Sequence, residues 1–263
     1  MQHVSHVGAP SRALLYTEPT RAAVEFGTFV ATAPLLRRAP RGDGHTVLVL
    51  PGFLTDDRST MVLRNYLASL GYHTYGWGLG RNVGPTPRIM DGMRALLARL
   101  AASAGAPVSI VGWSLGGMFA RGLAHQLPEH IREIVTLGSP FRNDQPIGSH
   151  AARSFERFAH LHVPHTELPA IDADRAQLPM PMTAVYTKGD GVVAWQTCLQ
   201  EDGFRRENVE VLGSHCGLGH NPAALWVTAD RLARRADAPW EPFHPPSLVR
   251  HLFPTPAPAS LAA

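Results

Sequence analysis

The sequence predicts an α/β fold: a doubly wound, mostly parallel sheet in a single domain, residues 1–263, with a small cap inserted in it. Short apolar runs bounded by glycine or proline alternate with longer helical patterns, as expected of βαβ units. The 263 residues are 44% hydrophobic and 17% charged, which is ordinary for a globular protein. This length suits one α/β domain with a substantial core.

Strands are predicted where apolar runs are short and end in turn residues. The clearest is TVLVL at 46–50, which is closed by Pro51-Gly52. The other predicted strands lie at 72–77, 107–112, 134–138, 182–187 and 209–212.

Helices are predicted where apolar residues recur every three or four positions. The pattern is clearest at 87–102, where Met90, Met93, Leu97 and Leu100 share one face. Further helices are expected at 20–30, at 59–70, from Leu115 onward and at 222–235.

Two segments depart from this alternation of strands and helices. Residues 140–181 are much longer than the usual connection of about 2–6 residues, so they are predicted to form a cap or lid. Apolar residues within 151–159 indicate one short amphipathic helix there. Residues 239–263 are rich in proline and are expected to form a tail that either wraps the surface or stays mobile.

The most informative motif is Gly112-Trp-Ser114-Leu-Gly116, a G-x-S-x-G pattern between a predicted strand and a predicted helix. Side chains at the two glycine positions would collide with neighbouring backbone in so sharp a turn. The turn raises the serine hydroxyl to a helix N-terminus, where the dipole favours developing negative charge. Ser114 is therefore the candidate nucleophile, and a plain strand–helix turn is the alternative interpretation.

A nucleophilic serine needs a base, and the base needs an orienting acid. Asp190 stands between two glycines directly after the predicted strand 182–187, where it is well placed to orient a base. A simple Asp-Gly turn is the alternative interpretation. The loop after the last predicted strand contains two candidate bases, His215 and His220.

In this order, the motifs resemble those of the α/β-hydrolase superfamily, and within it the small bacterial serine lipases and esterases. The resemblance covers about residues 46–235 and implies the α/β-hydrolase fold. It rests on the Pro51-Gly52-Phe53 turn, the Ser114 turn, residues 189–193 and residues 214–218.

The resemblance also implies roles for particular residues. In such lipases the catalytic histidine is followed by one residue, a glycine and an aliphatic residue, which matches His215 and leaves His220 as a helix N-cap or supporting group. An oxyanion hole is implied from the backbone N–H groups of Phe53 and Leu115. Many lipases have His-Gly where this chain has Pro51-Gly52, a change that leaves the Phe53 donor in place.

The expected function is hydrolysis of a carboxylic ester, a lipophilic small molecule whose size stays open, through an acyl-enzyme and without a cofactor. Acyl transfer or amide cleavage by the same triad is an alternative, because the motif shows how an acyl group is taken and not what receives it. A non-catalytic hydrolase-like binding protein is a third interpretation. The acyl chain length and the oligomeric state stay open.

Other partners and cofactors are not expected. The net charge is only +3 and no basic stripe with interleaved aromatic residues occurs, which disfavours nucleic acid. Gly78, Gly80 and Gly84 miss the G-x-G-x-x-G spacing of a dinucleotide loop. His160, His162 and His165 could bind a metal, but surface or cap histidines are the preferred interpretation.

The remaining features concern the cysteines and the location of the protein. Two cysteines, Cys198 and Cys216, exclude a disulfide-dense scaffold but leave open whether they form a bridge. Residues 1–10 lack the pattern of a signal peptide, so a cytoplasmic location is expected, with membrane association through the N-terminal segment left open.

Overall fold

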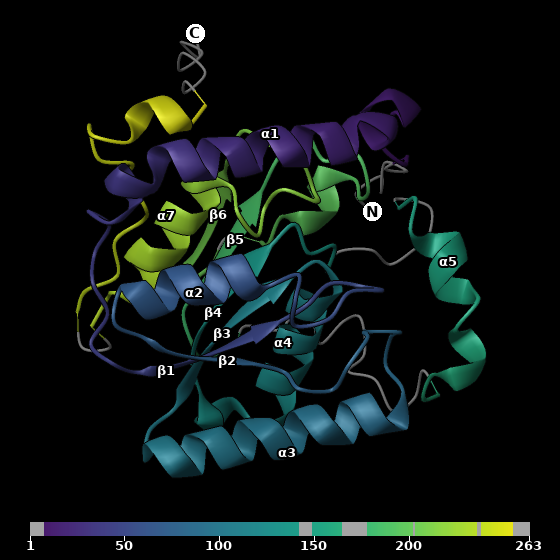
Figure 1. Cartoon of the computed structure of the whole chain (residues 1–263). Coiled ribbons are helices and arrows are strands. Elements are labelled where there is room, and N and C mark those ends of the chain that lie inside the picture. Colours follow the sequence, from purple (N-terminus) through teal and green to yellow (C-terminus); the bar gives the residue numbers. More distant parts are fainter. Residues whose placement is uncertain (1–7, 142–148, 165–177, 202, 236–237, 255–263) are drawn as a thin grey trace, which may run out of the picture.

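The computed structural model describes residues 8–141, 149–164, 178–201, 203–235 and 238–254 (Figure 1). Its centre is one parallel sheet with the strand order β2-β1-β3-β4-β5-β6. This confirms the predicted fold class. The strands are β1 (Thr46–Leu50), β2 (His73–Gly76), β3 (Val108–Trp113), β4 (Ile131–Leu137), β5 (Met182–Tyr186) and β6 (Arg206–Glu210).

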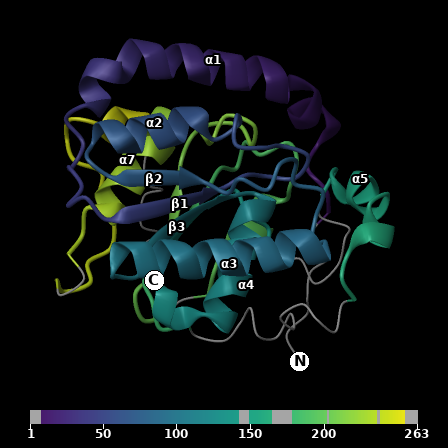
Figure 2. The same ribbon diagram turned by 60° about the horizontal axis from the view of Figure 1, so that its bottom comes forward.

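Helices cover both faces of the sheet, as Figures 1 and 2 show from two directions. One face carries α1 (Arg12–Leu36), α2 (Met61–Ser69) and α7 (Pro222–Leu232). The other carries α3 (Pro87–Ala104) and α4 (Leu115–Gln126), while α5 (Ala152–Glu156) lies to the side. Single 3-10 turns occur at Pro128–His130, Ala159–Leu161, Trp195–Cys198 and Arg250–Leu252.

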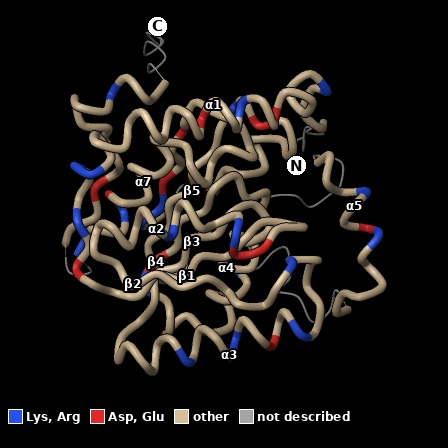
Figure 3. The backbone as a smooth tube through the Cα atoms, viewed as in Figure 1, with Lys and Arg blue, Asp and Glu red and all other residues tan. Residues whose placement is uncertain are grey.

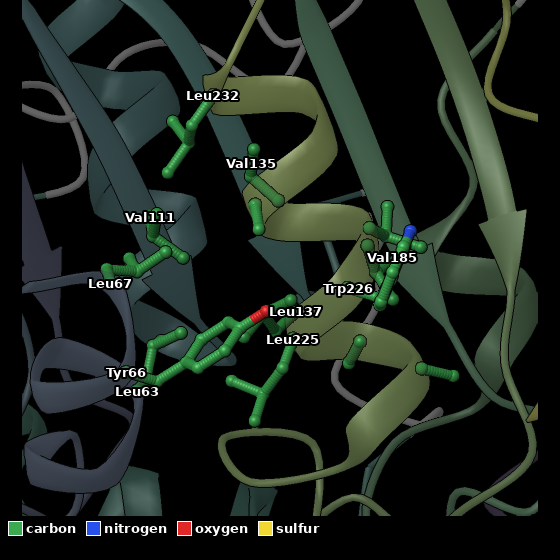
Figure 4. Packing of buried hydrophobic residues seen from close by; sticks show 14 of the residues in the cluster. Leu63, Tyr66, Leu67, Val111, Val135, Leu137, Val185, Leu225, Trp226 and Leu232 are labelled. Atoms are coloured by element: carbon green, nitrogen blue, oxygen red, sulfur yellow. The ribbon is translucent and has the colours of Figure 1, made fainter. Parts of the chain in front are cut away.

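The buried strands explain why the sheet needs both helical layers. All five residues of β1 are buried, with Val47 and Val49 in the core toward α2 and α7 and Leu48 and Leu50 in the core toward α3 and α4. Successive side chains of a strand point to opposite faces, so an apolar run such as TVLVL suits a strand covered twice. Figure 4 shows the first core, built from residues including Leu63, Leu67, Val111, Val135 and Leu225.

Local signals set the limits of α3. The Thr86 side chain accepts a hydrogen bond from the Ile89 N–H, and Pro87 occupies the first helical position. Gly105 ends the helix in the left-handed conformation, with φ of 61°.

Charged residues of both signs are interspersed over the described chain (Figure 3).

The first helix is longer than the predicted 20–30. It begins after Ser11, whose side chain accepts a hydrogen bond from Leu14 N–H, and it continues through Pro19 and Pro34 to Leu36. Contacts between α1 and two distant loops, described below, stabilise a helix that its prolines alone would disfavour. Despite its 25 residues, α1 is not apolar enough to cross a membrane, and the same holds for the other helices among the described residues.

The predicted cap and tail are described only in part. Within 140–181, α5 falls in the stretch 151–159 expected to be helical, and the turn Ala159–Leu161 begins at the last residue of that stretch. Residues 142–148 and 165–177 lie outside the described residues. In the tail, the side chains of Phe243, Val249 and Phe253 are buried in the core that α7 shares with the sheet.

Candidate active site

Ser114 stands in a strained turn between β3 and α4. Its backbone angles, φ of 52° and ψ of −120°, are values that residues other than glycine rarely adopt. A Cβ on Gly112 would overlap the backbone of Gly117, and one on Gly116 would overlap the carbonyl of Leu50. Both glycines are therefore required by the packing of the turn, as the sequence predicts. The Ser114 N–H donates to the Leu137 carbonyl at 2.8 Å, so the turn is held against the end of β4.

Two backbone N–H groups beside Ser114 are available to a ligand. Leu115 is the first residue of α4, and Phe53 lies in the turn after β1. That turn passes close to the serine, since a Cβ on Gly52 would lie 3.4 Å from the Ser114 Cβ. Within the described residues, neither the Phe53 N–H nor the Leu115 N–H donates to a protein acceptor. Backbone donors without a protein acceptor are the kind of group that a developing oxyanion needs.

Asn82 fixes the turn that carries Phe53, a role the sequence analysis missed. The side chain of Asn82 is fully buried and donates to the Pro51 carbonyl at 2.8 Å. Its backbone accepts from the Leu54 N–H at 2.7 Å and donates to the Thr55 carbonyl at 2.8 Å. A lone asparagine in a glycine-rich loop gives no sequence signal for such a role.

Asp190 and His215 form a buried, hydrogen-bonded pair. The His215 Nδ1 lies 2.6 Å from the Asp190 Oδ2, and both side chains are almost inaccessible to solvent. The other carboxylate oxygen, Oδ1, accepts the N–H groups of Val192 at 2.8 Å and Val193 at 2.7 Å. Asp190 is thus held in place and orients the imidazole with Nδ1 as the donor.

The pair lies at the same edge of the sheet as Ser114. A Cβ on Gly138 would lie 3.2 Å from the His215 Nδ1 and 3.5 Å from the Asp190 Oδ2, and Gly138 directly follows the Leu137 that binds the Ser114 N–H. The indole N–H of Trp113 also donates to the His215 carbonyl at 3.1 Å. Among the described residues, Ser114 and His215 are not joined by a hydrogen bond, a contact that often tightens only when substrate binds.

The surroundings of His215 favour its protonated form. Burial alone would lower the pKa of His215, but the charge of Asp190 and its hydrogen bond to the imidazole act in the opposite direction. The carboxylate of Glu18 adds to this effect, and the pKa of His215 lies above its ordinary value.

His220 and the cysteines have supporting or separate positions. His220 Nε2 lies 2.9 Å from the Ala22 carbonyl of α1, and the N-cap of α7 is Asn221, so the predicted N-cap role of His220 is wrong. The asparagine side chain is the short acceptor that an N-cap needs. Cys198 and Cys216 are both free thiols, which answers the question of a bridge. Burial and the neighbouring Glu18 raise the pKa of Cys216 to about 12.

A second acid–histidine–serine chain lies at the opposite edge of the sheet. His45 Nδ1 is 2.5 Å from Asp43 Oδ1, His45 Nε2 is 2.9 Å from Ser109 Oγ, and Ser109 donates to Glu133 at 3.2 Å. Ser109 is fully buried and lies inside β3, so its hydroxyl cannot meet a substrate. This chain is a structural network, and access distinguishes it from the Ser114 site.

The histidines of the cap region do not form a described metal site. The Nε2 atom of His162 lies 2.8 Å from the Val83 carbonyl, and His165 lies outside the described residues. Within the described ranges, no group of three His, Cys, Asp or Glu residues is placed to hold a metal ion.

Comparisons with known proteins identify the family and the fold. A family model for the alpha/beta hydrolase fold matches residues 46–192, more than half of the chain; the match begins after α1 and ends before His215. No curated protein matches the chain.

Solved structures with the same fold include three at low sequence identity. Aspergillus fumigatus lipase B superposes with a TM-score of 0.57 and 15% identity, over 76% of this chain and 57% of the lipase. The chain thus spans little more than half of that lipase. A structure from the metagenome-derived lipolytic enzymes LipS and LipT has a TM-score of 0.55 and 15% identity, over 74% and 95% of the two chains. A putative non-heme bromoperoxidase from Mycobacterium tuberculosis has a TM-score of 0.49 and 15% identity, over 75% and 95%. At this identity, the likeness to the first two structures, whose TM-scores exceed 0.5, shows the fold alone.

Proposed function

Because the chain belongs to the alpha/beta hydrolase family, we propose that it hydrolyses carboxylic esters with Ser114 as nucleophile, His215 as base and Asp190 as orienting acid. The observation that carries this proposal is the buried Asp190–His215 hydrogen bond of 2.6 Å at the edge of the sheet where Ser114 stands. The fold alone would support many chemistries, so the proposal depends on this site.

The proposed reaction has two acyl-transfer steps. His215 Nε2 accepts the Ser114 proton as the serine oxygen attacks the ester carbonyl, and the same proton then passes to the leaving alcohol. Water, deprotonated by His215, next attacks the acyl-enzyme; as the bond to the serine oxygen breaks and the acid is released, the proton passes from His215 back to Ser114. The N–H groups of Phe53 and Leu115 bind the oxyanion in both steps, and donors of this kind contribute about 10²–10³ in rate each.

Aromatic side chains beside the oxyanion turn support a lipophilic substrate. The ring of Phe53 lies 5.3 Å from that of Phe155 and 6.0 Å from that of Phe158, measured between centroids. These rings give the turn and the neighbouring α5 segment an apolar surface suited to an acyl chain or an apolar alcohol.

Hydrolysis of p-nitrophenyl esters from acetyl to palmitoyl tests the proposal. Ser114→Ala should lower kcat by at least about 10³-fold, because the nucleophile is lost while the oxyanion donors remain. Ser109→Ala is the matched control, since its serine belongs to the second, buried network and kcat should stay unchanged. Activity that survives in Ser114→Ala would refute the mechanism. A folded wild type that cleaves none of these esters would refute ester hydrolysis.

A further inference from the structure

Helix α1 presents three charged side chains, Glu18, Arg21 and Glu25, to the two loops that hold Asp190 and His215. The spacing of three and then four residues places them on one face of the helix. Glu18 is only 2% exposed, which is unusual for a carboxylate in a helix. The helix lies outside the segment matched by the family model, so the family resemblance does not account for this face.

The carboxylate of Glu18 joins the two loops directly. Its Oε1 accepts the Gly191 N–H at 2.7 Å and the His215 N–H at 3.0 Å, and its Oε2 accepts the Cys216 N–H at 2.8 Å. One side chain therefore binds the residue after the acid and the backbone of the histidine itself. The N–H groups of Gly191 and His215 would otherwise be buried donors without a partner, which proteins rarely tolerate.

Arg21 and Glu25 extend these contacts on either side. Arg21 Nη1 donates to the carbonyls of Gly189 at 2.6 Å and Gly213 at 3.2 Å, and its Nη2 donates to Glu18 Oε1 at 2.9 Å. Glu25 Oε1 accepts the Ser214 N–H at 2.8 Å and the Ser214 hydroxyl at 2.6 Å. The polar face of α1 thus holds both loops in one arrangement.

We propose that Glu18 is a positioning residue for the reaction: it fixes the His215 loop to the Asp190 loop, and its negative charge stabilises the imidazolium that forms as Ser114 attacks. The inference rests on the proposed function, since it assigns a role in that same site. Glu18 touches the backbone of His215 and acts through it, while Asp190 contacts the ring.

The electrostatic part of this role depends on every charged or titratable group near His215. Asp190 comes from the loop after β5, and Glu18, Arg21 and Glu25 come from α1. Cys216 and His220 lie on the histidine's own loop. After burial, which lowers the pKa of His215, the groups that raise it are Asp190 and then Glu18.

Glu18→Gln removes the charge with almost no change in shape. The pKa of His215, followed by NMR titration of its ring, should fall, because the imidazolium loses a facing negative charge. The acidic limb of kcat/KM should move to lower pH by the same amount, since the base must be neutral to accept the Ser114 proton. We also expect kcat at its plateau to fall by up to about 10²-fold, because an amide cannot accept all three N–H bonds and the loops shift.

Glu25→Gln is the matched control on the same helix. It removes the charge of a partly buried carboxylate that anchors Ser214 but is not among the groups that raise the pKa of His215, so it should lower the unfolding temperature without moving that pKa. A merely structural role for Glu18 predicts the same behaviour for both variants. An unchanged His215 pKa in Glu18→Gln, with only the unfolding temperature lowered, would overturn the proposal.

Two further measurements keep the test decisive. Glu18→Asp retains the charge but has a side chain one methylene shorter, so kcat should fall while the pKa of His215 stays raised. A wild-type kcat in Glu18→Asp would overturn the positioning role. This variant still gives an answer if Glu18→Gln does not fold. The NMR titration needs no turnover. A wild type without esterase activity would therefore refute the proposed function, while the His215 pKa in wild type and in Glu18→Gln would still show whether Glu18 acts on the imidazole.

Discussion

Ser114 adopts a positive φ of 52° in a turn that leaves no room for a side chain at Gly112 or Gly116, two residues before and after it. The sequence contains this information, since Gly112 and Gly116 flank the serine at the spacing that the turn needs. The sequence around Asn82 gives no such signal, although this residue fixes the neighbouring turn through three hydrogen bonds. Its contacts with Pro51 and Leu54 cross from one loop to another, and only the folded chain brings them together.

Replacing Asn82 with aspartate should test this residue at nearly constant shape. A carboxylate cannot donate to the Pro51 carbonyl, so the turn loosens and the Phe53 N–H moves away from its position beside Ser114. Because the oxyanion forms only in the transition state, we expect kcat to fall by about 10–10² with little change in KM. Steady-state kinetics on a p-nitrophenyl ester measure both constants. Asn65→Asp, on the exposed face of α2, is the control, and a raised KM with normal kcat would contradict the interpretation.

Among the elements, β1, β2, β3 and β5 were predicted to within one residue, but α1 was not. The strand β4 begins three residues before the predicted 134–138, and β6 overlaps the predicted 209–212 only at residues 209–210. Strands such as β1 are apolar on both faces and end in turn residues, which makes their limits readable. The helix at the N-terminus has exposed apolar residues, including Tyr16, Val24 and Val30, and two internal prolines, so its pattern does not reveal its length. Its limits depend on contacts that α1 makes with loops nearly 200 residues away, such as the bond from Cys216 to Glu18.

Gly191 tests how closely α1 must approach the acid loop. A Cβ at this position would lie 2.5 Å from the carbonyl carbon and oxygen of Leu14, so either the helix or the loop must shift. Backbone atoms cannot move aside as a flexible side chain can. We expect Gly191→Ala to lower both kcat and the unfolding temperature, measured by ester hydrolysis and by thermal denaturation.

The control for this change lies in α1 itself. Gly27 is inside the helix and a Cβ there would meet nothing within 4 Å, so Gly27→Ala should raise the unfolding free energy by about 0.5–1 kcal/mol. Gly191→Ala with normal kcat would show that the approach of α1 to the acid loop does not matter for the reaction. A destabilised Gly27→Ala would show that α1 is not packed as described.

In the whole molecule, the parallel sheet separates two polar networks. Residues at the carboxyl ends of parallel strands converge on one edge, and the resemblance to α/β-hydrolases is what led the sequence analysis to expect Ser114, Asp190 and His215 there. The network of Asp43, His45, Ser109 and Glu133 at the other edge was not predicted. Ser109 and Glu133 lie inside buried, mainly apolar strands. The apolar pattern of such a strand predicts the strand itself but not the contacts of a single polar residue within it.

Glu133 makes the stability of the whole molecule depend on pH. Burial raises its pKa to about 7, against the opposing effect of Arg132 and the hydrogen bond from Ser109. Between the unfolded pKa of 4.5 and about 7, the folded state holds a proton on Glu133 that the unfolded state has lost. The free energy of unfolding should therefore decrease as pH rises through this window, by about 3 kcal/mol from this residue, and then change no further on its account.

Glu133→Gln should remove this dependence, because the amide resembles the protonated acid at every pH. We expect the variant to be close to wild type at pH 5 and more stable than wild type at pH 8, as measured by urea denaturation at both values. Glu129→Gln is the control, since the side chain of Glu129 is 63% exposed and its removal should leave the pH dependence in place. If wild type and Glu133→Gln lost stability in parallel from pH 5 to pH 8, another group would be responsible. Because the network lies at the edge of the sheet opposite the Ser114 site, kcat at pH 8 should be the same in both proteins, which separates the stability of the fold from the chemistry it holds.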